Sequence, residues 1–167
     1  MGYKMKNIKD MTSYMQATAK VMNGAKVHVG VLEGENAWLA GIHEYGCTIP
    51  VTNKMRAYLH HIGVHLKKST TQIVIPERSF LRAGYDKCRD EVLDKAEDVL
   101  PAVLIGTMSE NQYFELVGTL LRDSIKEYAV DLAEPPKKPF PTADPSKMNP
   151  LIQTGDMING IEYEVSK

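Results

Sequence analysis

The chain has 167 residues, of which 43% are hydrophobic and 25% are charged, values that are ordinary for one globular domain. Twenty basic and 21 acidic side chains give a formal net charge of -1, so the chain as a whole lacks the basic surplus that tight nucleic-acid binding usually needs. Two cysteines are too few for a disulfide scaffold, and no run of 18 apolar residues indicates a membrane span.

Periodic apolar residues predict the elements at the start of the chain. Steps of three and four residues predict a helix over residues 4–22, and alternating valines predict a half-buried strand from Val27 to Val31. A helix is expected next over residues 35–46, where Trp38, Ile42 and Tyr45 stand at helical spacing and Gly46 stops the helix.

The middle of the chain is expected to form two extended segments around a short helix. Residues 48–51 are expected to be extended, because Pro50 disfavours a helical residue before it. A helix is predicted over residues 53–66 with Met55, Leu59, Ile62 and Leu66 on one side, and the β-branched run at 70–76 predicts a strand.

Two long helices are predicted in the second half. The first begins near Phe80 and runs to about Leu100, where Pro101 bends or ends it; its apolar stripe consists of Leu81, Cys88, Val92, Ala96 and Val99. A capping box from Ser109 to Gln112 precedes the second helix, whose stripe consists of Phe114, Val117, Leu121, Ile125, Tyr128 and Leu132.

The C-terminal part is predicted to contain a long loop, a helical turn and a strand. Residues 133–150 hold six of the nine prolines, so they are expected to form an extended loop that orders against a partner. One helical turn capped by Thr154 and an alternating strand from Ile161 to Val165 follow. We therefore expect a single α+β domain over residues 1–167, in which about four helices pack on a small, mostly antiparallel sheet that the C-terminal strand closes.

The segment His43–Glu44 is similar to the start of the zinc-binding pattern H-E-x-x-H, but the fifth position is Cys47 and Gly46 breaks the helix before it. A second group, His60, His61 and His65, contains an i, i+4 pair but lacks a nearby third ligand of recognised spacing. A metal-dependent hydrolase that uses both groups is kept as an alternative, beside the interpretation that these side chains hydrogen-bond locally or face a partner.

Other catalytic patterns are not found in the sequence. Cys88 falls on an apolar helical stripe and is expected in the core, whereas Cys47 has no local signature of a nucleophile. No G-x-G-x-x-G or G-x-x-x-x-G-K-[ST] segment is present to hold phosphates. The residues alone therefore predict no catalytic, cofactor-binding or metal site and no enzyme.

Three segments, "IHEYG", "IPERSFLR" and "PLIQTGDMINGIEYEV", occur in this order over about positions 26 to 165. Together they resemble the neck and tail-completion proteins of tailed bacteriophages, also labelled virion morphogenesis or head–tail joining proteins. The typical patterns are H-E-[FY]-G, I-P-x-R-x-F-[LI]-R and P-L-x-x-T-G-x-[LM]-x-x-S-I-x-Y-x-V. Gly160 replaces the common Ser, and Asp156 the common Arg, which leaves the branch of the family open.

The resemblance implies a structural virion protein of the neck or tail, made in the cytoplasm of the bacterial host. It would assemble as a ring, with six copies expected, that joins the tail tube to the head connector. Its partners would be copies of itself and other neck, connector and tail-tube proteins, with DNA at most passing through and no membrane involved. Carried onto this chain, the motif and subunit-interface candidates are His43, Glu44, Tyr45, Gly46, Pro76, Arg78, Phe80, Arg82, Thr154 and Gly155.

Two interpretations of the second segment are left open. Arg78 and Arg82 could contact carboxylates of a neighbouring subunit, while Phe80 anchors in a pocket. Alternatively, Phe80 is plain core and Arg78 pairs with Glu77 or Asp86 in its own chain. For His43 and Tyr45, packing of the first two segments against each other is expected. A DNA-binding module is a further alternative, against which the charge balance argues.

Overall fold

The computed structural model describes residues 15–16, 19, 23–136, 149–152 and 154–166. The predicted N-terminal helix over residues 4–22 and the middle of the proline-rich loop fall largely or wholly outside these residues. Within them, nine elements follow one another: β1 (Lys26–Val31), α2 (Gly34–Tyr45), β2 (Cys47–Pro50), α3 (Asn53–His61), β3 (Gln72–Ile75), α4 (Phe80–Leu104), α5 (Glu110–Asp131), α6 (Asp156–Asn159) and β4 (Ile161–Ser166).

The fold is α+β, as predicted, with the C-terminal strand in a sheet. β1 pairs antiparallel with β4, with Lys26 opposite Ser166 and Val31 opposite Ile161. The strands of the middle segment form a second antiparallel pair, with Cys47 opposite Ile75. Two separate two-stranded sheets thus take the place of the single expected sheet.

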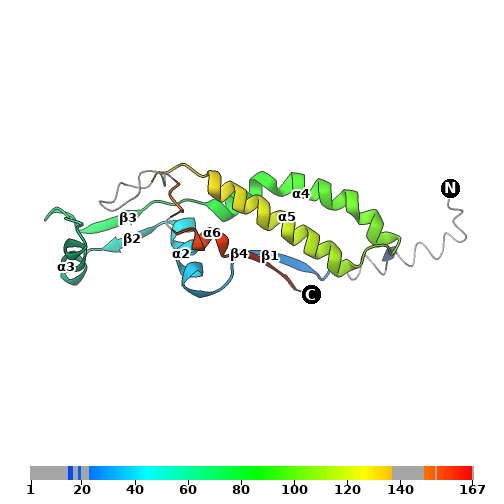
Figure 1. Cartoon of the computed structure of the whole chain (residues 1–167), viewed down its shortest axis with the longest axis horizontal. Coiled ribbons are helices and arrows are strands. Elements are labelled where there is room, and N and C mark those ends of the chain that lie inside the picture. The colour runs from blue at the N-terminus through cyan, green and yellow to red at the C-terminus, as the bar shows by residue number, and fades with distance from the viewer. Residues whose placement is uncertain (1–14, 17–18, 20–22, 137–148, 153, 167) are drawn as a thin grey trace, which may run out of the picture.

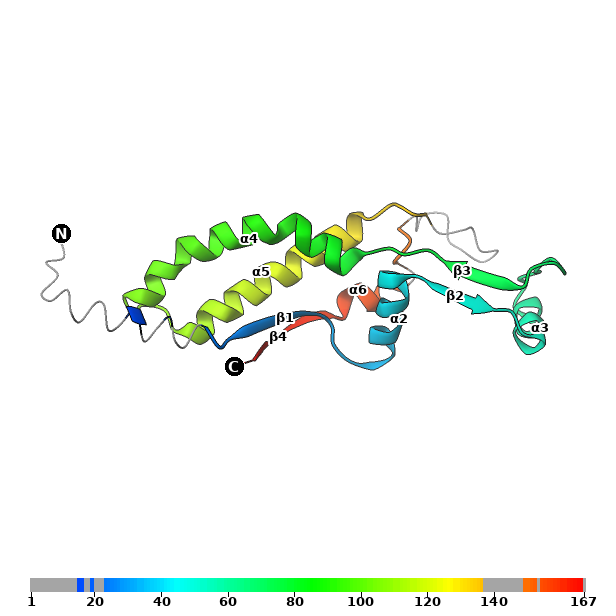
Figure 2. The same ribbon diagram turned by 180° about the vertical axis from the view of Figure 1, so that it is seen from behind.

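The molecule is elongated and has two ends of different construction (Figures 1 and 2). The antiparallel helices α4 and α5 extend toward one end, where α5 lies between α4 and the β1–β4 sheet, with α2 and α6 at the other end of this sheet. At the other end, β2 and β3 project from the body and carry α3 at their tip. We call this projecting segment, residues 47–75, the arm.

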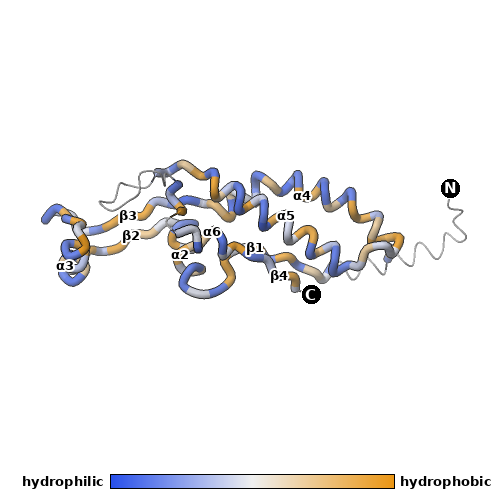
Figure 3. The backbone as a smooth tube through the Cα atoms, in the orientation of Figure 1, coloured by the Kyte–Doolittle hydropathy of each residue, from blue (hydrophilic) through white to orange (hydrophobic). Residues whose placement is uncertain are grey.

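The hydrophobic core lies between the helical hairpin, the β1–β4 sheet and the turn of α6. The two long helices show alternating hydrophilic and hydrophobic positions along their lengths (Figure 3), as expected for helices with one buried face. Buried positions on α4 repeat every four residues, and they meet buried positions of α5, α6 and β4. The core contains Ala40, Phe80, Cys88, Val92, Ile125, Ala129, Leu151, Met157, Ile158 and Ile161.

Helix α3 ends five residues earlier than predicted. Gly63 adopts a positive φ of 88°, and the N–H groups of Val64 and Gly63 donate to the carbonyls of Leu59 and His60 at 2.7 and 3.1 Å. This is a Schellman motif, which ends the helix because the chain turns to the left-handed conformation that glycine accepts. Leu66 therefore does not extend the apolar stripe of α3.

The ends of the longer helices follow local signals. The capping box of α5 is confirmed, since Ser109 Oγ accepts from the Gln112 N–H at 3.2 Å and the Gln112 side chain accepts from the Ser109 N–H at 2.9 Å. Helix α4 continues one turn past the expected end. Pro101 lies inside its last turn and does not end it, since the Pro101 carbonyl still accepts from the Ile105 N–H.

Gly118 of α5 lets the ring of Tyr163 from β4 lie directly on the helix. A β-carbon at this position would overlap the Tyr163 ring. The Tyr163 hydroxyl donates to Glu115 at 2.6 Å, which holds the ring in place from the same helix. We expect Gly118→Ala to lower the free energy of unfolding by about 1–3 kcal/mol, because overpacking outweighs the better helix propensity of alanine.

Urea unfolding followed by circular dichroism measures this effect. Gly41→Ala in α2 is the matched control, because a β-carbon there meets no atom within 4 Å. The control should gain about 0.5–1 kcal/mol from helix propensity alone. A Gly118→Ala variant as stable as Gly41→Ala would contradict the packing of Tyr163 on α5.

Candidate functional site

The first two family-like segments meet where α2 ends and α4 begins. Glu44, in the last turn of α2, is the centre of this contact, and its residue is only 2% exposed. Its carboxylate accepts from the backbone N–H groups of Leu81 and Arg82 at 2.9 and 3.1 Å, and from the Ser79 hydroxyl at 2.9 Å. The Arg82 side chain adds an ion pair at 2.9 Å. We call these four residues the Glu44 cluster.

Glu44 caps helix α4 from outside that helix. Ser79 stands at the N-cap position, but its side chain accepts no hydrogen bond from the helix. The first N–H groups of a helix need acceptors, and a negative charge near them is favoured by the helix dipole. Glu44 supplies both, so the carboxylate of the His43–Glu44 pair is engaged by the start of α4.

Arg82 covers the Glu44 carboxylate on its solvent side. Its guanidinium pairs with Glu44 and also with Glu77 at 2.7 Å, and it stacks over the Tyr45 ring at 4.8 Å from the centroid. The Arg82 side chain is half exposed. Tyr45 thus packs the first segment against the second, as predicted.

Arg78 is buried and links α2 to the chain that follows α5. Its residue is 5% exposed. The Arg78 backbone N–H donates to the His43 carbonyl at 2.7 Å, and Nη1 lies 3.3 Å from His43 Nδ1. Nε and Nη2 donate to the carbonyls of Pro135 and Pro136 at 2.8 and 3.3 Å. The predicted packing role of His43 is confirmed by these contacts.

The contacts of Phe80, Arg78 and Arg82 within the chain bear on the alternatives left open for the second segment. Phe80 is 0% exposed and belongs to the core, as the second alternative expected. Arg78 forms no ion pair among the described residues, so the pairing with Glu77 or Asp86 that belonged to this alternative is wrong. The carboxylate partners of Arg82, Glu44 and Glu77, lie in its own chain.

Backbone geometry fixes how the two segments approach each other. Gly46 has φ 71° and ψ 167°, and a β-carbon there would come within 2.8 Å of the Glu77 nitrogen. This combination of angles and close contact is open to glycine alone. Pro76 directly follows β3 and begins the turn that leads into α4.

The third segment joins the same core from the opposite direction. Asn149, the residue directly before it, donates to the carbonyls of Ala129 and Val130 at 2.8 and 2.6 Å, near the end of α5. Gly155, with φ 94°, is the N-cap of α6 in place of the predicted Thr154. Thr154 stands one residue earlier, and its hydroxyl accepts from the Asp156 N–H at 3.4 Å and donates to the Asp156 carboxylate at 2.7 Å.

Burial and local contacts shift the pKa values of the two acid–base groups in this region. Burial raises the pKa of Glu44, but the hydrogen bonds from Leu81, Arg82 and Ser79 together outweigh it and hold the pKa below its ordinary value. Burial, and then the positive charge of Arg78, lower the pKa of His43. The neutral ring of His43 can then accept at Nδ1 from Arg78.

Stability is expected to fall in acid in two steps. His43 has a pKa in the folded state below its ordinary 6.5. The stability that the neutral ring contributes is therefore full above about pH 6.5 and is lost as the pH falls toward the folded pKa. The Glu44 contribution is full above about 4.5 and is lost below that pH. Urea unfolding at stepped pH should show both, and His43→Gln should remove only the first step. An unchanged first step in His43→Gln would assign it to another group.

The residues of the hydrolase alternative do not come together. His43 and Glu44 lie in α2 within the body, whereas His60 and His61 end α3 at the tip of the arm (Figures 1 and 2). His65 follows the helix, and its ring packs edge-on against His60 at 4.5 Å between centroids. Within the part of the chain that the structure describes, no three His, Cys, Asp or Glu side chains are grouped to hold a metal ion.

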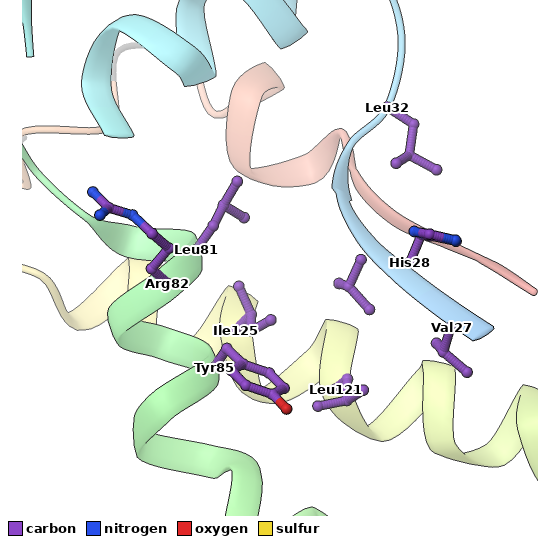
Figure 4. A pocket seen from close by; sticks show the side chains of 9 residues that line it. Val27, His28, Leu32, Leu81, Arg82, Tyr85, Leu121 and Ile125 are labelled. Atoms are coloured by element: carbon purple, nitrogen blue, oxygen red, sulfur yellow. The ribbon is translucent and has the colours of Figure 1, made fainter. Parts of the chain in front are cut away.

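A groove of ≈ 460 Å³ opens between β1 and the helical hairpin (Figure 4). Leu81 and Tyr85 of α4 and Leu121 and Ile125 of α5 line it on the side of the hairpin, and Val27 and His28 line it on the side of β1. Arg82 reaches its rim from the Glu44 cluster. The lining is mainly apolar and brings no set of acid–base groups together: Val27, His28, Val29, Leu32, Leu81, Arg82, Tyr85, Leu121 and Ile125.

No protein-family model, curated protein or solved structure matches this chain. None of the helices in the described ranges has the length and apolar character needed to cross a membrane. Sequence reasoning missed the Glu44 cluster, because Ser79 is itself a residue type that commonly caps a helix, and no local signal indicates that Glu44, 35 positions earlier, supplies the acceptor.

Proposed function

We propose that this chain is a structural subunit of a tailed-phage virion, located at the neck or tail end, where copies form a ring that joins the tail tube to the head connector. The observation that carries the proposal is the convergence of the three segments on which the family resemblance depends. The first two are joined through Glu44, and the third supplies α6 and the strand that pairs with β1.

The chemistry of these segments supports a scaffold more than a reaction site. Glu44, Arg78 and Phe80 are buried in the body, and their polar atoms are satisfied by the chain itself. Among the described residues, no buried side-chain nitrogen or oxygen lacks a hydrogen-bond partner. Side chains held in this way fix the geometry of the body and are unsuited to exchange protons with a substrate.

Surface features also support assembly. Trp38 of α2 is 71% exposed, and its neighbour Leu39 is exposed too. Tryptophan is among the residues that most often contribute strongly to protein–protein interfaces. An exposed tryptophan in the body and a projecting arm give the subunit two different surfaces, which a head-to-tail ring requires.

Electron microscopy of particles tests the proposal. In the phage or prophage that encodes the chain, antibody labelling should mark the junction between head and tail, and removal of the gene should leave heads and tails unjoined. Expression of the chain from a second copy of the gene should restore joined particles. Absence of the chain from purified particles, or joined particles without it, would overturn the proposal.

A further inference from the structure

The arm carries an unbalanced positive charge. It contains four basic residues and no acidic residue, although the chain as a whole has a net charge of -1. Lys54, Lys67 and Lys68 are exposed and form no ion pair among the described residues. Arg56 is committed within the arm, because its guanidinium donates to the carbonyls of Leu66, Lys67 and Thr70. Three lysines near the tip thus remain free to meet a partner.

Helix α4 carries the opposite charge on one exposed face. Its acidic face consists of Asp86, Asp90, Asp94 and Asp98, which repeat every four residues, and all four are exposed. This stripe is two residues, or about 200°, around the helix from the buried positions, so it points away from α5. Asp90 pairs with Arg89, whereas the other three form no ion pair within the described ranges.

The arm and the acidic face of the same molecule extend in opposite directions. β3 leads into α4 through residues 76–79, and from this junction the arm projects to one end while α4 runs toward the other (Figures 1 and 2). An arm can therefore meet an acidic face only on a second copy. Such a contact joins two different surfaces, which is the geometry that builds rings or filaments.

We infer that the arm of one subunit docks on the acidic face of α4 in the next subunit. This inference rests on the proposed function, because it assigns the surfaces through which the ring would form. Exposed ion pairs alone contribute only about 0–1 kcal/mol each, so hydrophobic contact must assist them. Tyr58 and Val74 are exposed on the arm, and Leu93 is exposed beside Asp94 on α4. Both surfaces thus combine charge with apolar area.

Charge exchange between the two surfaces tests the docking in the full-length chain. Lys67→Glu/Lys68→Glu reverses the charge of the arm, and Asp94→Lys/Asp98→Lys reverses the charge at two positions of the acidic face. Each double variant should weaken self-association, measured by sedimentation velocity, by at least about tenfold in Kd. The four substitutions combined should restore association to within about threefold of the unchanged protein, because attraction is re-established with opposite signs.

Glu33→Lys/Glu35→Lys is the matched control. It makes the same change in net charge as Asp94→Lys/Asp98→Lys, at exposed positions before and at the start of α2. Association of this control should stay within about twofold of the unchanged protein. Raising the salt concentration should weaken association of the unchanged chain, since the contact depends on exposed charges. Far-ultraviolet circular dichroism should show that all variants stay folded.

Three results would overturn the docking. These are association of both charge-reversed variants at the strength of the unchanged protein, no association of the unchanged protein at any concentration, and failure of the combined variant to recover. Loss of duplex DNA binding in the arm variant, with self-association intact, would instead assign the arm to phosphate contacts. If the variant with the reversed arm charge still formed joined particles, the docking would be wrong, whereas the proposed neck function would stand.

Discussion

Replacing Glu44 with alanine is expected to lower the free energy of unfolding by about 3–5 kcal/mol. The change removes the carboxylate that accepts from the Leu81 and Arg82 N–H groups at the start of α4. It also leaves the Ser79 hydroxyl and the Arg82 guanidinium without their Glu44 contacts. Urea unfolding at neutral pH, followed by circular dichroism, measures the loss.

Two companion variants separate the capping role from a general effect of α2. Glu35→Ala, in the exposed first turn of the same helix, should change stability by no more than about 0.5 kcal/mol. Glu44→Gln retains the shape and one acceptor but loses the charge, so its loss should be intermediate. A Glu44→Ala protein as stable as Glu35→Ala would show that α4 does not depend on this carboxylate.

Replacing Phe80 with alanine is expected to cost about 3–5 kcal/mol of unfolding free energy. Phe80 is the first residue of α4 and is fully buried, and the core around it includes Cys88 and Ile125. Removal of the ring leaves a cavity at the point where the helical hairpin meets the rest of the core. The same denaturant titration, with the protein dilute, measures the change.

Leu93→Ala is the control on the same helix. Because Leu93 is 52% exposed, this substitution should lower the free energy of unfolding by no more than about 0.5 kcal/mol. Phe80→Leu should lose less than Phe80→Ala because it fills part of the cavity. If Phe80→Ala kept its stability and lost only self-association, the ring would be an anchor in a neighbouring subunit, which was the other interpretation that the sequence left open.

In the sequence, the Glu44 cluster is easily mistaken for part of a reaction site. A histidine followed by a glutamate on a helix is a familiar arrangement in metal enzymes. Here the backbone N–H that Glu44 binds belongs to a residue 37 positions further along the chain. The local pattern contains no trace of that partner, so only the packing of α2 on α4 reveals the role.

Local signals were sufficient for most of the secondary structure. The alternating valines of β1 and the capping box before α5 each act within a few residues, and the structure contains the elements that they predict. The missed end of α3 shows the limit of a periodic pattern. Its apolar spacing continues to Leu66, but the backbone bonds around Gly63 end the helix first.

The sequence by itself determined the α+β class, the order of the elements and the segments that resemble neck and tail-completion proteins, because propensity, capping and motif spacing are properties of neighbouring residues. Only the tertiary structure decided that the strands form two separate pairs, that Phe80 and Arg78 are buried, and that the basic arm extends away from the acidic face of α4. The physical reason is that burial and charge neutralisation depend on which distant segments of the chain are brought together, and no local pattern specifies which segments these are.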